Sequence, residues 1–142
     1  WLLTRGLRTL PVRMEKHQQQ ALTVAQFLET HPKVKQVFYP GLKSHPQQDL
    51  IQKQLRGFSG LLSFIPHGND EQIFQFIDSL KWFQTGCSWG GFESLVIPIG
   101  FHMDEETEKK LGIPHGLVRL SIGLESLDTL LNDLDTALAG LP

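Results

Sequence analysis

Residues 86–95 and 117–123 carry the groups of this chain that are best suited to bind a small anion. The first segment is a turn rich in small residues, with the hydroxyl of Ser88 and the indole of Trp89 near its apex. The second has the pattern of a strand that presents Arg119 from an apolar run. A hydroxyl and free backbone N–H groups beside a planar guanidinium make a receptor for a carboxylate. The sequence therefore predicts a carboxylate site, without a reactive group to accompany it.

The spacing around Arg119 allows two interpretations. Alternation over residues 117–122 sends the apolar side chains to one face of the strand and Arg119 with Ser121 to the other. This pattern alone favours an arginine on a solvated sheet face. The strand precedes a capped helix, however, where a rigidly held arginine can point into a cleft and loses little entropy on binding a carboxylate.

The turn also has a simpler interpretation. Gly90 and Gly91 permit backbone conformations that let a ligand approach the main chain, but they also suit a plain tight turn with Trp89 as a core aromatic. Cys87 has no histidine nearby in the sequence, so we expect a buried or half-buried thiol rather than a nucleophile.

Other chemistries find little support. The six histidines are scattered without metal-ligand spacing, and we find no nucleotide-binding fingerprint. The formal net charge of -2 provides no basic field for nucleic acid or a membrane surface. A single cysteine suits a reducing cytoplasm, and no apolar run approaches the ~20 residues that span a bilayer. We therefore expect a cytoplasmic protein that binds neither metal, nucleic acid nor membrane.

The elements that must position these residues follow from hydrophobic periodicity and breakers. We expect helices over residues 7–31, 46–57, 69–80 and 126–140, and strands over 34–39, 60–65, 95–99 and 117–122. Pro11 either starts a new helix or kinks a long one, and Pro98 confines its strand to an edge or a loop. Residues 102–116 form a surface excursion, Asn69 and Gln72 form a capping box, and Ser126 caps the last helix. At 142 residues, this predicts one α/β domain: a single sheet with helices mainly on one face.

Several segments together resemble the carboxy-terminal domain of the pyridoxal-phosphate enzymes of cysteine and methionine metabolism. They occur in the family's order and cover nearly the whole chain: residues 4–10 with Arg13-Met14, His31-Pro32 with Val34 and residues 37–42, residues 57–64, residues 88–95, residues 118–125, and Asp133-Leu134.

The resemblance implies an aminotransferase-like fold of type I, with residues 1–142 as the single small C-terminal domain and residues 1–31 as a linking helical segment. The large domain, with the Schiff-base lysine and the pyridoxal phosphate, would lie outside this chain, which would be inactive alone. By resemblance, Arg119 and Ser88 bind the substrate's α-carboxylate, Trp89 adds a main-chain N–H, and Gly90 and Gly91 support the turn. No residue here is implied as catalytic or as cofactor-binding.

Within the family, a tryptophan after the serine is typical of bacterial cystathionine β-lyases, and these are the members that the chain most resembles. Cys87 lines the substrate site by position, but it replaces the glutamate common in the γ-enzymes and the tyrosine of those β-lyases. The implied reaction is α,β-elimination of L-cystathionine in a homotetramer. A methionine or cystathionine γ-lyase, a cystathionine γ-synthase, and a non-catalytic α/β module that binds an amino acid or a partner stay open as alternatives.

Overall fold

The computed structural model describes residues 1–101 and 103–142. The elements follow in the order α1 (Leu2–Arg8), α2 (Leu10–Thr30), β1 (Val34–Phe38), α3 (Gln48–Gln54), β2 (Leu61–Pro66), α4 (Asp70–Ser79), β3 (Gln84–Thr85), β4 (Leu95–Pro98), α5 (Glu105–Leu111), β5 (Val118–Ser121) and α6 (Leu127–Leu138).

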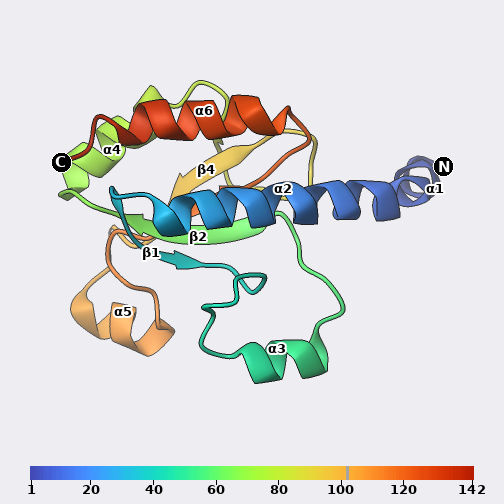
Figure 1. The fold of residues 1–142 in the computed structure, drawn as a ribbon, viewed down its shortest axis with the longest axis horizontal. Helices are drawn as coiled ribbons and strands as arrows, with labels where there is room; N and C mark the ends of the chain where they lie inside the picture. The colour runs from blue at the N-terminus through green and yellow to red at the C-terminus, as the bar shows by residue number, and fades with distance from the viewer. Residues whose placement is uncertain (102) are drawn as a thin grey trace.

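The strands form one five-stranded sheet in the order β1-β2-β5-β4-β3 (Figure 1). The first three pairings, β1 with β2, β2 with β5 and β5 with β4, are antiparallel, while β3 pairs with β4 in parallel. The strand that carries Arg119 therefore lies in the middle of the sheet, where two neighbours hold its backbone rigidly.

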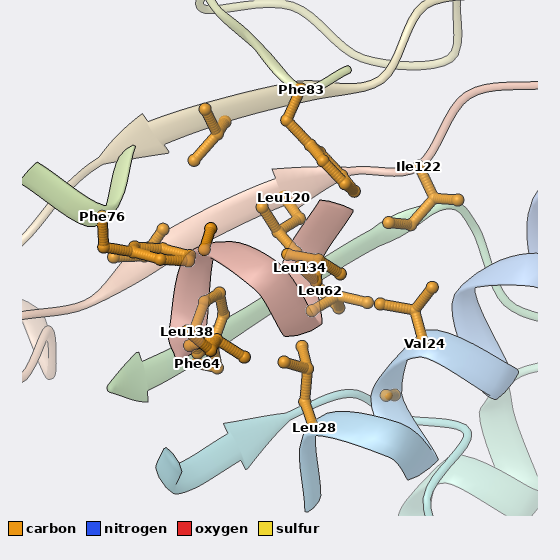
Figure 2. Close-up of a cluster of buried hydrophobic side chains, with 14 of the residues drawn as sticks. Val24, Leu28, Leu62, Phe64, Phe76, Phe83, Leu120, Ile122, Leu134 and Leu138 are labelled. Atoms are coloured by element: carbon orange, nitrogen blue, oxygen red, sulfur yellow. The ribbon is translucent and has the colours of Figure 1, made fainter. Parts of the chain in front are cut away.

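Helix α6 contacts both α2 and α4, and the three helices cover one face of this sheet (Figure 1). The core lies between them and the sheet, and its labelled side chains point towards each other in Figure 2. They come from α2 (Val24, Leu28), β2 (Leu62, Phe64), α4 (Phe76), β5 with its following residue (Leu120, Ile122), α6 (Leu134, Leu138), and Phe83 before β3. The predicted α/β class, with one sheet and helices mainly on one face, is confirmed.

The junction between α1 and α2 decides between the two interpretations of Pro11. Helix α1 ends at Arg8, Thr9 lies between the helices, and Pro11 occupies the first turn of α2. Proline is tolerated there because the first N–H groups of a helix have no intrahelical acceptor. Pro11 thus belongs to the start of a new helix, and it does not kink one long helix.

The two predicted caps behave differently. The side chain of Asn69 accepts from the backbone N–H of Gln72, and the Gln72 side chain accepts from the backbone N–H of Asn69, so the capping box of α4 is confirmed. Ser126 occupies the N-cap position of α6 but makes no side-chain cap hydrogen bond. The predicted position of this cap is therefore confirmed, whereas the predicted side-chain hydrogen bond is not formed.

Two local expectations were wrong, the edge position of β4 and the bounds of α3, and two short elements, β3 and α5, were not predicted. Strand β4 is internal, because β3 pairs with its first two residues. Since β3 ends before Ile97, no neighbouring strand on that side requires a donor from Pro98, which has no N–H. Helix α3 begins at Gln48 and ends at Gln54, rather than running from Pro46 to Gly57. The predicted excursion contains α5, capped by Asp104, although residue 102 itself lies outside the described residues.

Among the helices that the structure describes, none combines the length and the hydrophobicity needed to cross a membrane.

Candidate functional site

Arg119 lies on the face of the sheet opposite the core. Strand β5 pairs it with Ser63 of β2 and with Ile97 of β4, whereas its neighbours Val118 and Leu120 are buried among the core residues. The side chain is only half-buried as a whole, yet its Nε and Nη2 atoms are buried and have no hydrogen-bond partner among the described residues. The solvated sheet face favoured by spacing alone is therefore not what the structure shows.

The two unpartnered atoms share one edge of the guanidinium plane. This edge carries two parallel N–H donors, which match the two oxygens of a carboxylate. A buried donor that lacks an acceptor costs free energy, about 1–3 kcal/mol for an ordinary group and more for a charged one. A bound carboxylate would offset this cost, so the unpartnered edge of Arg119 is suited to bind an anion.

The turn of residues 86–91, here called the receptor turn, begins beside the same part of the sheet. The N–H of Gly86 donates to the carbonyl of Val96 at 3.2 Å, and the β3–β4 register continued by one residue sets Gly86 level with Ile97. Ile97 is the partner of Arg119 on β5. Two strand spacings, about 10 Å, thus separate the start of the turn from the Arg119 backbone.

The receptor turn is exposed to solvent. Cys87 and Ser88 are exposed, and Trp89 is 63% exposed, so the expected buried thiol and the core aromatic are both wrong. Backbone donors of residues 87–91 make no hydrogen bond within the described residues and are free to bind a ligand.

A polar network that the sequence reasoning missed joins the end of this turn to the end of β5. The Glu125 carboxylate accepts from the backbone N–H of Ser94 at 2.7 Å and from its hydroxyl at 2.8 Å. The Ser94 hydroxyl oxygen accepts from the N–H of Gly123 at 2.9 Å, and the N–H of Leu124 donates to the carbonyl of Phe92 at 2.8 Å. These hydrogen bonds connect the segment that follows the turn to the segment that follows the strand of Arg119. Ser94 and Glu125 both lie in segments that resemble the enzyme family, and this was the sequence signal that could have pointed to the network.

Helix α2 holds the same strand end from within the core. Buried His17 contacts the carbonyl of Ile122 through Nδ1 at 2.6 Å, and buried Gln20 donates from Nε2 to the carbonyl of Gly123 at 2.8 Å. Since a carbonyl only accepts, Nδ1 of His17 carries the proton. The sequence signal was two polar residues on the apolar face of a helix that also bears Ala21 and Val24.

The sequence profile of the Cys/Met metabolism PLP-dependent enzymes matches residues 1–139 of this chain. Cystathionine γ-lyase of Sus scrofa is 46% identical over 97% of the chain and 35% of its own length. Cystathionine β-lyase of Lactococcus lactis subsp. cremoris is 39% identical over 97% of the chain and 37% of its own length.

Solved structures agree with these sequence relatives. Cystathionine γ-synthase from Xanthomonas oryzae pv. oryzae, in complex with cystathionine, superposes with a TM-score of 0.88 at 41% identity, over 96% of this chain and 36% of that one. The chain thus spans little more than a third of the length of the proteins it matches. With matched sequence over nearly all its residues and matched fold, the chain belongs to the family of pyridoxal-phosphate-dependent enzymes of cysteine and methionine metabolism.

Proposed function

We propose that the protein carrying this chain cleaves a carbon–sulfur bond of L-cystathionine by α,β-elimination, releasing homocysteine, pyruvate and ammonia. In this proposal the chain binds the α-carboxylate of the substrate. The observation that carries it is the buried, unpartnered Nε and Nη2 edge of Arg119, whose geometry suits a carboxylate.

The receptor turn supplies the second half of the carboxylate site. The Ser88 hydroxyl and the N–H of Trp89 are exposed and unengaged within the described residues, and both are neutral donors. Arg119 pairs with the negative charge of the carboxylate and sets the plane of the group, while these donors limit its rotation. A substrate held at these points presents its Cα–H bond in one orientation, which is a positioning contribution to the rate.

The cofactor itself does not fit the residues of this chain. A Schiff base requires a lysine amine sheltered from water, but each lysine here is exposed except Lys33, which is half-buried and lies just before β1. Pyridoxal phosphate, which serves in such enzymes as an electron sink for the substrate, would be held by the remainder of the protein. No step is assigned to it on these residues.

A second candidate is γ-elimination of the same substrate. The relatives named cystathionine γ-lyase reach 46% identity, whereas those named cystathionine β-lyase reach 39%. Against it stand Trp89, which follows Ser88 as in bacterial β-lyases, and Cys87, which offers no carboxylate for a distal amino group. A synthase reaction, or a non-catalytic domain that only binds an amino acid, would be recognised by the absence of both elimination products.

Product analysis of the full-length protein with pyridoxal phosphate and L-cystathionine tests the proposal. Pyruvate with homocysteine supports α,β-elimination, and 2-oxobutyrate with cysteine shows γ-elimination instead. Neither product, with no bound chromophore, contradicts the enzymatic function.

Arg119→Ala tests the role of this chain within that function. Loss of two charge-assisted hydrogen bonds should raise KM by about tenfold or more while the cofactor absorbance stays intact. Arg119→Lys should also raise KM, because an ammonium cannot reproduce the bidentate fork. The exposed Arg56 gives a matched control, Arg56→Ala, with KM near that of the parent. An unchanged KM in both Arg119 variants would remove this residue from the site.

A further inference from the structure

We infer that Arg13 is a positioning residue of the carboxylate site, acting through the receptor turn; this inference rests on the function proposed above. Arg13 lies in the first turns of α2 and is half-buried. Its Nη1 donates to the carbonyl of Gly90 at 3.3 Å, across 77 positions of sequence. This is the one hydrogen bond that the described part of the chain makes to residues 87–91.

The other nitrogens of Arg13 anchor the guanidinium at the junction of α1 and α2. Nη2 donates to the carbonyl of Gly6 at 3.1 Å, and Nε donates to the hydroxyl of Thr9 at 3.3 Å. A side chain that is fixed at two further points loses little rotamer freedom when it binds Gly90. Arg13 therefore holds the turn from a rigid base.

The same helix also holds the other half of the receptor. Arg13, His17 and Gln20 lie at spacings of four and three residues, which set them on one side of α2. Each contacts a backbone carbonyl of the site region: Gly90 in the turn, and Ile122 and Gly123 directly after the strand of Arg119. One rigid helix thus determines the separation between the Ser88 turn and the Arg119 strand.

Without Arg13, the exposed turn would keep attachments only at its two ends, through Gly86 and Phe92. Gly90 has φ of +74°, and nothing lies within 4 Å of the place where its side chain would be, so neighbouring side chains do not restrain it. Substrate binding would then have to order this segment, and the entropy of ordering would weaken binding. The predicted effect is on KM, because the groups that touch the substrate are unchanged.

The test uses the full-length holoenzyme and L-cystathionine, with KM and kcat measured for Arg13→Ala, Ser88→Ala and the double variant. Arg13→Ala should raise KM about three- to tenfold and leave kcat within about twofold. In the Ser88→Ala background the same change should have a smaller effect, because one of the two donors that Arg13 positions through the turn is gone. Thr9→Ala removes one anchor of the Arg13 guanidinium and should raise KM by less than Arg13→Ala does, whereas Arg8→Ala on exposed Arg8 should leave KM near the parent value.

Arg13→Gln, which keeps a polar side chain but cannot reach all three acceptors, serves if Arg13→Ala does not fold, and the same rise in KM is expected. An unchanged KM, or a rise that adds fully to that of Ser88→Ala, overturns the inference. A raised KM in Arg8→Ala equal to that of Arg13→Ala also overturns it, since the loss of any positive charge near the helix junction would then be responsible. If Arg119→Ala has no effect on KM, the proposed function fails, whatever Arg13 does.

Discussion

At the scale of single residues, the proposed carboxylate site combines polar groups that differ in how their hydrogen bonds are satisfied. Arg119 has two buried donors that find no partner in the described part of the chain, whereas Glu125 accepts two hydrogen bonds from Ser94. A satisfied network holds its atoms rigidly, and an unsatisfied donor gains free energy when a ligand supplies the acceptor. The network of Glu125 and Ser94 therefore suits support of the site, and the donors of Arg119 suit binding.

Gly123 is the residue where this support leaves least room. A Cβ there would lie 2.4 Å from the carbonyl oxygen of Phe92 and 2.5 Å from the carbonyl carbon of Glu93, both backbone atoms that cannot rotate away. Gly123→Ala should therefore lower the free energy of unfolding by about 1–3 kcal/mol, as overpacking does.

Urea unfolding of the Gly123→Ala variant checks this expectation. Gly6→Ala is the matched control, because nothing lies within 4 Å of that position and α1 is helical there; it should be neutral or stabilise by up to about 1 kcal/mol. Equal free energies of unfolding for the two variants would contradict the prediction, because they would mean that the backbone around Gly123 shifts to accommodate the added Cβ.

At the scale of elements, His115 connects α5 to α4. Its Nε2 lies 2.8 Å from Asp70 Oδ1 at the start of α4, and its Nδ1 lies 3.2 Å from Glu108 Oε1 in α5. The hydrogen bond to Asp70, with a smaller contribution from Glu108, raises the pKa of His115 against the opposing effect of burial. The protonated ring thus joins two carboxylates.

This contact makes stability depend on pH in a defined direction. The folded-state pKa lies above the unfolded value of about 6.5, so the contribution is fully present below about pH 6.5 and is lost as pH rises through the raised pKa. The gap in unfolding free energy between the parent and His115→Gln should therefore be larger at about pH 6 than at about pH 9.

His67→Gln is the matched control for this pH comparison, since the His67 side chain makes no hydrogen bond or ion pair within the described residues. Its gap from the parent should not depend on pH in this way. A gap for His115→Gln that stays constant, or that grows at alkaline pH, would contradict the contact.

At the scale of the whole molecule, our proposal makes this chain one side of a larger site. It spans little more than a third of the length of its relatives, none of its lysines is buried, and α1 buries no residue. Apolar side chains of residues 1–12 are correspondingly exposed, namely Trp1, Leu2, Leu3, Leu7, Leu10 and Val12.

We expect the isolated chain of residues 1–142 to bind no pyridoxal phosphate and to release no product from L-cystathionine. Absorbance spectroscopy after removal of free cofactor checks the first part and a pyruvate assay the second, with circular dichroism to establish that the chain is folded. A stoichiometric chromophore on the folded chain would contradict the expectation.

The sequence determined much of the fold because its signals were local. Periodicity in residues 117–122, the Asn69–Gln72 capping box and the apolar stripe of α6 each depend on neighbours a few positions apart, and the structure bears out all three. The resemblance to the enzyme family likewise depends on ordered short motifs, and the profile match confirms it.

Tertiary structure alone decided which polar groups meet and which stay unpartnered. The pairing of β3 with β4 joins residues that are 11 positions apart, and the bond from Arg13 to Gly90 spans 77 positions. The burial of the Arg119 donors depends on what packs around that one side chain. Periodicity tells which face a residue takes on its own element, but burial and hydrogen bonding depend on what the rest of the chain brings to that face. For this reason the sequence proposed the receptor residues, while only the fold showed that the Nε and Nη2 atoms of Arg119 are buried and that α2 contacts both the turn and the end of β5.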